Sequence, residues 1–286
     1  MTLLWALVLW LFGPLVLSAL LYYAVAPWIS RRRPIRLKPL LSALPEVTES
    51  RAALDLAIEE GQILRVKERF LQASDEELSR STRLLFDWRL PLTSLACGLT
   101  EMVDLTNGKA LAGSLRATLS DKKDALNELC LIRLEEGASL VLRPRCIAGL
   151  LLPAGGRCEI RRHWVFFRWQ AWVTLQFRYF EFRGPVSLLI SGGRGVRVER
   201  LLREDRPEGG SRRVDSGSLL GFTPNLAYRP VRAETFWAYY RGQNPLFDDL
   251  FSGPGLFLCQ ASGQESGAGQ KFWGSLRRLF LKAIGS

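Results

Sequence analysis

The chain has a single histidine, His163, and this limits the chemistry that its other side chains could perform. Ser216 lies in the sequence Asp215-Ser216-Gly217-Ser218 and has the residue type of a nucleophile. A catalytic serine needs a general base within hydrogen-bonding reach, and His163 would have to supply it. The G-x-S-x-G pattern is missing around Ser216, and Gly217 suits a turn that needs a positive φ angle. The sequence therefore predicts no catalytic residue.

The remaining candidates for chemistry are equally weak. Asp248 and Asp249 are adjacent, so in a strand they would face opposite sides, which does not suit paired-carboxylate catalysis. Cys146 and Cys158 have no second pair of ligands near them in the sequence, as a zinc site would require. The glycine-rich stretch 192–195 lacks the Gly-Lys-Ser/Thr ending of a phosphate-binding loop and predicts a hairpin turn. We expect no enzymatic activity, no cofactor and no bound metal.

Charge and composition narrow the class of partner. The 286 residues carry 39 Lys and Arg against 28 Asp and Glu, a net charge of +11, and 48% of them are hydrophobic. This composition excludes a disordered chain and favours an anionic partner. From Arg161 to Trp169, arginines alternate with aromatic residues, which fits single-stranded nucleic acid, anionic lipid or, most simply, a solvated strand face. Of the two anionic partners we favour membrane lipid over nucleic acid.

The N-terminal region is apolar. Leu3 to Ile29 carries no charged side chain and exceeds the roughly 20 residues that cross a bilayer, so residues 1–30 are predicted to be a transmembrane helix. A cleaved signal peptide is disfavoured because no basic n-region and no small-x-small cleavage site are present. Basic residues follow the apolar run: Arg31, Arg32, Arg33, Arg36 and Lys38. By the positive-inside rule, this predicts a single-pass protein of the bacterial inner membrane with its C-terminal domain in the cytoplasm.

Four further regions follow the apolar run. Residues 31–45 read as a basic, proline-containing linker, and 46–90 as two helices rich in Leu, Ala, Glu and Arg, with a capping box at Ser74-Asp75-Glu76-Glu77. Residues 91–262 have the short alternating runs and Gly or Pro turns of a β domain. Residues 263–286 read as a flexible linker and an amphipathic helix that contacts lipid or packs on the domain. Its expected membrane-contact residues are Phe272, Trp273, Arg277, Arg278, Phe280 and Lys282.

The β region contains an internal repeat. Residues 182–190 match residues 251–259, because both have an aromatic residue, a Gly-Pro pair and an apolar run in the same order. Upstream, Ser139-Leu140-Val141-Leu142 lies a comparable distance before Ser211-Arg212-Arg213-Val214. The fold class expected is therefore mainly β, with two similar β halves in one domain.

Residues in the second half of this domain carry a resemblance to a known family. The residues concerned are Val214, Asp215, Gly217, Gly221, Phe222, Gly253, Pro254 and Gly255. Over residues 95–262, the chain resembles the Altered Inheritance of Mitochondria protein 24 family. The resemblance implies a duplicated β-sandwich similar to the tryptophan-RNA-binding attenuation protein, often assembled as a trimer, without known catalytic residues. Mitochondrial members are implied to organise complexes at the inner membrane.

Together these features lead to a functional expectation. We expect a non-enzymatic, membrane-anchored protein whose cytosol-facing β domain self-associates as a homo-oligomer, such as a trimer, and acts as a scaffold or membrane-organisation factor. The alternative is a membrane-tethered module that binds nucleic acid.

Overall fold

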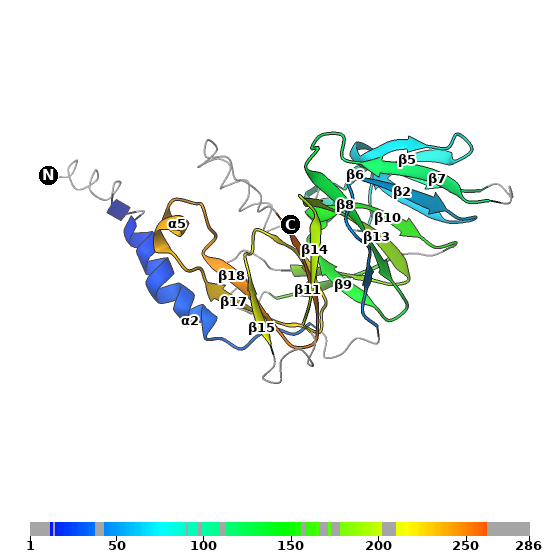
Figure 1. Cartoon of the computed structure of the whole chain (residues 1–286). Coiled ribbons are helices and arrows are strands. Elements are labelled where there is room, and N and C mark those ends of the chain that lie inside the picture. Colours follow the sequence, from blue (N-terminus) through cyan, green and yellow to red (C-terminus); the bar gives the residue numbers. More distant parts are fainter. Residues whose placement is uncertain are drawn as a thin grey trace.

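The computed structural model of the chain describes residues 12–13, 15–37, 43–89, 91–96, 99–108, 113–155, 158–165, 171–172, 178–201 and 210–261. These residues form four antiparallel β-sheets, with the helices α2 (Ala26–Ser30) and α5 (Phe236–Tyr240) at one end of the molecule (Figure 1). The expectation of a mainly β protein is confirmed.

The strand pairing repeats three times along the chain, in units of six strands that we call the first, second and third copy. In each copy, the first and third strands pair with the sixth, and the second and fourth pair with the fifth. The first copy comprises β2 (Ala53–Ile58), β3 (Ile63–Lys67), β4 (Leu71–Ser74), β5 (Ser79–Leu85), β6 (Thr100–Thr106) and β7 (Leu115–Ser120). The second comprises β8 (Asn127–Leu134), β9 (Ser139–Leu142), β10 (Ile147–Leu152), β11 (Glu159–Trp164), β12 (Arg178–Arg183) and β13 (Val186–Gly193). The third comprises β14 (Val196–Leu201), β15 (Ser211–Val214), β16 (Leu219–Phe222), β17 (Ala227–Arg232), β18 (Phe247–Ser252) and β19 (Gly255–Gln260).

Neighbouring copies join by sharing sheets. The second strand of one copy pairs with the third strand of the next, so β3 pairs with β10 and β9 pairs with β16. The resulting sheets have the orders β1-β8-β13-β10-β3-β6-β5, β11-β12-β9-β16-β19-β14, β15-β18-β17 and β2-β7-β4, where β1 is Glu46–Val47. We call the contact between β3 and β10 the first junction and that between β9 and β16 the second junction.

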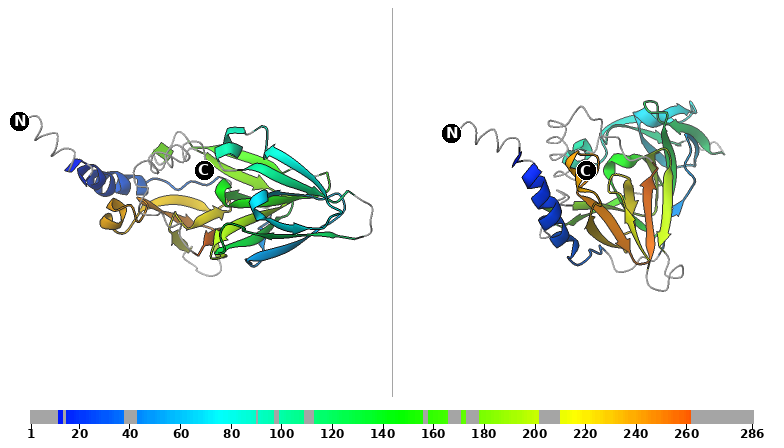
Figure 2. Two further views of the ribbon diagram at one scale, coloured as in Figure 1. Left: turned by 90° about the horizontal axis from the view of Figure 1, so that it is seen from above. Right: turned by 60° about the vertical axis from the view of Figure 1, so that its left-hand side comes forward.

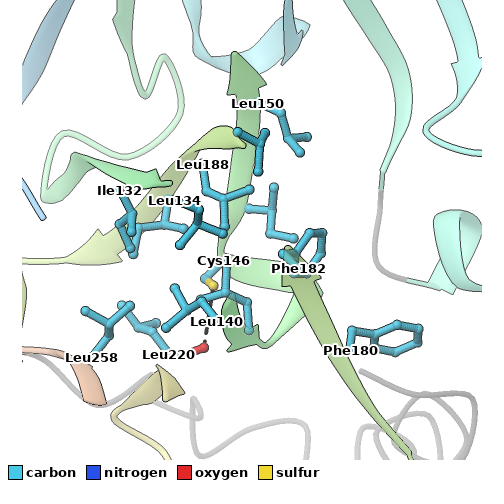
Figure 3. Close-up of a cluster of buried hydrophobic side chains, with 14 of the residues drawn as sticks. Ile132, Leu134, Leu140, Cys146, Leu150, Phe180, Phe182, Leu188, Leu220 and Leu258 are labelled. Carbon is cyan, nitrogen blue, oxygen red and sulfur yellow. Dashed lines mark hydrogen bonds between the residues drawn. The ribbon is translucent and has the colours of Figure 1, made fainter. Parts of the chain in front are cut away.

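Three apolar cores separate the four sheets. The middle core lies between the two large sheets, and Figure 3 shows its side chains converging around Leu188 and Cys146. The large sheets are apolar on both faces: in β8, Ile132 points into the middle core and Leu131 into the core of the first copy. This explains why β8 reads as a continuous apolar run rather than an alternating one.

The first copy occupies the region that we predicted to be helical, and that prediction over residues 46–90 is wrong. Leu54, Leu56 and Ile58 point toward the core of the first copy and alternate with more exposed residues, which is the period of a strand. Composition favoured helix, but burial of this alternating face decides the structure. The expected capping box is a turn between β4 and β5, in which the Asp75 carboxylate accepts a hydrogen bond from the Arg116 amide at 2.6 Å.

The expectation of two β halves is also corrected, because the same pairing occurs in three copies. The predicted domain boundary at residue 91 falls inside the first copy, between β5 and β6. Gly184-Pro185 and Gly253-Pro254 connect the fifth and sixth strands of the second and third copies. The first copy makes this connection through residues 107–114, which contain no Gly-Pro pair.

The apolar N-terminal region packs against the third copy. Residues 15–20 are helical and continue through the π-helical segment η1 (Leu21–Val25) into α2 (Ala26–Ser30). Tyr22, Ala26 and Ile29 are buried on one side of this helix, and the Tyr22 hydroxyl donates hydrogen bonds to the carbonyl oxygens of Ala233 and Glu234, both at 2.7 Å. Figure 2 shows the helix beside α5 (Phe236–Tyr240).

This arrangement corrects the membrane prediction. Within the ranges given above, no helix is long and apolar enough to cross a bilayer, so the transmembrane helix predicted for residues 1–30 and the single-pass inner-membrane location are wrong. An apolar run can serve packing against protein as well as against lipid, and hydropathy alone does not separate the two. Residues 1–11 of the predicted span lie outside the described residues.

Candidate functional site

The residues of the family resemblance build turns and close contacts in the third copy. The Asp215 carboxylate accepts hydrogen bonds from the Gly217 amide at 3.2 Å and the Ser218 hydroxyl at 3.0 Å, which fixes the turn between β15 and β16. Val214, at the end of β15, packs against the core of the third copy. Phe222 is buried in the same core, where its ring stacks on Tyr228 with centroids 6.0 Å apart. These residues are therefore structural.

Two glycines of the resemblance, Gly221 and Gly255, lie where an added Cβ would meet atoms of a neighbouring strand or turn. A Cβ on Gly221 would lie 2.5 Å from the Val141 carbonyl oxygen across the second junction. A Cβ on Gly255 would lie 2.5 Å from the Thr223 hydroxyl, and Gly253 has φ +97° before Pro254. A larger residue at either close contact would push the strands apart.

The expected membrane-contact residues fall into two groups. Arg31, Arg32, Arg33 and Arg36 are exposed after α2, and the Arg32 guanidinium lies 4.2 Å from the centre of the Trp28 ring. Lys38 and all the expected contact residues of the C-terminal tail lie outside the described residues: Phe272, Trp273, Arg277, Arg278, Phe280 and Lys282.

A small cavity lies at the second junction. Its polar lining includes Arg143, Tyr179, Tyr228 and Asp249. Arg143 donates to the Ser216 carbonyl oxygen at 2.6 Å and lies 3.9 Å from the Asp249 carboxylate. Burial raises the pKa of the Tyr228 hydroxyl well above its usual value, and the nearby Asp249 carboxylate adds to this rise. The cavity volume of about 30 Å³ leaves room for about two water molecules.

A second small cavity lies between the first and second copies, lined mainly by apolar residues and by none of the residues of β3 or β10. Phe86, Ile160, Phe180 and Phe182 line it, and its volume is about 10 Å³. Both volumes are far below the roughly 300–1,000 Å³ of typical small-molecule pockets. Neither cavity has room for an organic substrate.

The candidates for catalysis and metal binding are not assembled into a site. The His163 Nε2 atom lies 2.5 Å from the Glu181 carboxylate across the β11–β12 pair, whereas Ser216 is in the turn after β15. Burial raises the pKa of the Cys146 and Cys158 thiols to about 12, which leaves them protonated and unreactive near neutral pH. Among the described residues, no group of three or more His, Cys, Asp or Glu side chains could hold a metal ion.

Exposed aromatic residues form the feature that our sequence reasoning missed. All five tryptophans in the described part of the chain are exposed: Trp28 by 45%, Trp88 by 68%, Trp164 by 53%, Trp172 by 58% and Trp237 by 59%. Three of them lie in the connection between the fourth and fifth strands of a copy, one in each copy. Only the three-copy pairing makes this regularity visible.

The N-terminal helix presents a second exposed apolar surface. Phe12, Val16, Leu17, Leu20 and Tyr23 are each more than half exposed, and the Tyr23 ring also contacts Phe236 of the third copy, with centroids 5.5 Å apart. We call these five exposed residues the helix stripe. Phe12, Val16, Leu20 and Tyr23 are spaced by three and four residues, which places them along one side of the helix, and Leu17 lies beside Val16.

Comparison with known proteins supports the fold alone. No family model matches the chain, and no curated protein matches it. Among solved structures, the crystal structure of protein SPYM3_0169 from Streptococcus pyogenes is similar, with a TM-score of 0.51 and 13% sequence identity. The similarity covers 82% of this chain and 99% of that one. At this identity, it shows a related β fold and carries no activity.

Proposed function

We propose that this protein is a non-enzymatic scaffold that self-associates through the helix stripe. The observation that carries the proposal is a helix with two apolar sides. One side is fixed on the third copy through Tyr22, Ala26 and Ile29, and the other side is exposed.

An exposed apolar side is costly in water. Each Å² of apolar surface removed from solvent contributes about 25 cal/mol, so pairing two helix stripes would be favourable. Soluble monomers rarely expose a continuous apolar patch of this kind, and larger patches mark interaction sites. Residues 3–29 contain no charged side chain that would oppose the approach of a second copy.

The nucleic-acid alternative has less support from the geometry. Arg161, in the Arg and aromatic stretch of β11, is held by the Glu159 carboxylate at 2.7 Å. This ion pair and that between Arg183 and Glu159 at 3.5 Å direct two basic groups toward a carboxylate. We therefore favour the scaffold.

We also propose that the chain is a distant member of the Altered Inheritance of Mitochondria protein 24 family. The support is that its eight motif residues occupy the turns and close contacts that the third copy needs. The structure of a family member tests this: the motif residues should occupy the same turns, and a different placement would refute membership.

Self-association is tested by measuring the mass of the full chain in solution by light scattering across a concentration series. We expect oligomers for the wild type and monomers for Val16→Glu/Leu20→Glu, because charges would then be buried in the interface. The control is Leu44→Glu, an exposed leucine away from the helix, which should leave the oligomers intact. A monomeric wild type, or an oligomeric double variant, would refute the proposal.

A further inference from the structure

The helix stripe continues onto α5 through aromatic rings in mutual contact. The Tyr23 ring, at one end of the stripe, has its centroid 5.5 Å from that of the Phe236 ring. The Phe236 ring in turn lies 5.2 Å from the Trp237 ring and 6.0 Å from the Tyr240 ring, again between centroids. Trp237 and Tyr240 are both exposed, and we call them the α5 rings. The stripe and the α5 rings therefore form one continuous apolar surface.

The stripe alone is small for a stable contact between proteins. A standard interface removes about 800 Å² of surface from each partner and involves roughly 20–30 residues on each side. The stripe has five residues, so neighbouring side chains must contribute to any contact that it makes. The α5 rings are joined to it through Phe236, and tryptophan and tyrosine often supply much of the binding energy at interfaces.

Positive charge at one end of the helix limits how two copies can pair. Residues 12–30 contain no charged side chain, whereas Arg31, Arg32 and Arg33 follow α2 and are exposed. Parallel pairing of two helices would bring these arginines of both copies together, and like charges oppose association. Antiparallel pairing places the two groups of arginines at opposite ends of the contact.

We infer that two copies pair with their helix stripes antiparallel, and that the α5 rings of each molecule pack on the partner's Phe12. The stripe runs from Phe12 to Tyr23, about 16 Å along a helix. Antiparallel overlap of two whole stripes therefore brings the partner's Phe12 beside Tyr23, where the α5 rings lie. This inference rests on the proposed self-association, and it adds the direction of the contact and the surface that completes it.

Cysteine cross-linking of the full chain tests the direction. Phe12→Cys mixed with Tyr23→Cys should give linked dimers with a short bismaleimide, because antiparallel pairing brings these two positions together. Each variant alone should give no more linked product than the wild type, which controls for the native cysteines. Phe12→Cys that links to itself would show parallel pairing and overturn the inference, as would oligomers that link in no combination. Both results would leave the proposed function standing, whereas a monomeric wild type would refute that function itself.

A second variant tests the contribution of the α5 rings. Trp237→Ala/Tyr240→Ala should raise the dissociation constant, measured by light scattering across a concentration series, at least about tenfold, because aromatic side chains at the interface are lost. Trp164→Ala is the matched control, since Trp164 is an exposed tryptophan on β11 in a different sheet, and it should leave the constant unchanged. Circular dichroism should show the same β content in all three proteins.

An unchanged dissociation constant in the α5 variant would overturn the role of the rings. If that variant self-associated normally but floated less with phosphatidylserine vesicles than the wild type, the α5 rings would be assigned to a lipid surface instead.

Discussion

The two junctions between copies have the same backbone arrangement and differ in their side chains. At both, the third strand of a copy has an irregularity in its register just before a glycine, Gly149 in β10 and Gly221 in β16. A Cβ on Gly149 would lie 2.6 Å from the Arg65 carbonyl oxygen, as close as the corresponding contact at Gly221. At the first junction, Arg65 of β3 forms an ion pair with Asp104 of β6 at 2.8 Å, whereas at the second junction Arg143 lies 3.9 Å from Asp249. The backbone approach is therefore the shared requirement, and the charged side chains around it can differ in how closely they pair.

The largest expected effect tests the shared requirement. Gly149→Val and Gly221→Val should each lower the free energy of unfolding by about 3 kcal/mol, because the added atoms overlap backbone of the neighbouring copy. Urea unfolding followed by circular dichroism measures this. Gly108→Val is the control, since a Cβ there meets no atom within 4 Å, and it should change stability by less than about 0.5 kcal/mol. If one junction tolerated valine, the two would not share a backbone requirement.

A smaller effect tests the difference between the junctions. Asp249→Asn at the second junction should lower the free energy of unfolding by about 2 kcal/mol, because the half-buried Arg143 guanidinium loses the charge of the buried Asp249 carboxylate. High salt should not reproduce the loss, since a buried carboxylate is weakly screened. Asp248→Asn is the comparison variant, because Asp248 is the adjacent residue and its carboxylate forms an ion pair with the exposed Arg213. Equal effects of the two substitutions would mean that the second junction does not depend on its buried charges.

An effect of similar size concerns the segment that leads from the first copy into the second. Burial raises the pKa of Asp121, but hydrogen bonds from Arg69 and Asn127 outweigh it and lower the pKa to about 2. Because this value is below that of the unfolded chain, the stabilisation is complete above about pH 4 and is lost as the pH falls toward 2. The loss should be about 2 kcal/mol in unfolding experiments between these values.

Asp121→Asn should flatten this part of the pH profile. Asp55→Asn, at an exposed strand position, should leave the profile unchanged. A profile of the Asp121 variant that still falls by the same amount would assign the acid sensitivity to other carboxylates.

Part of this fold could be predicted from the sequence. The Gly-Pro pairs at 184–185 and 253–254 revealed two related copies because both mark the same turn. The first copy has no such pair, and its alternation in Leu54-Asp55-Leu56-Ala57-Ile58 was outweighed by a composition rich in helix-forming residues. Local composition is a weak guide where burial against a second sheet decides the structure.

The exposed apolar surfaces were harder to predict for a related reason. Trp88, Trp172 and Trp237 lie far apart in the sequence and share no motif, so they become comparable only when the strand pairing is known. The apolar helix was visible in the sequence, but its two sides could not be assigned without knowing that Tyr22 and Ile29 face the third copy. The motif residues around Gly221 were found from the sequence, and their role is structural.

The third strand of the first copy, β4, has the same register irregularity as β10 and β16, but the residue after it is Ala73 rather than glycine. In the two junctions, a Cβ on the glycine would lie 2.5–2.6 Å from a carbonyl oxygen of the neighbouring copy. The backbone of a further unit joined in the same way at this edge would approach the Cβ of Ala73 as closely. The Ala73 methyl group therefore opposes the joining of a further unit at the β4 edge, and it keeps growth of a β-sheet there separate from association through the helix.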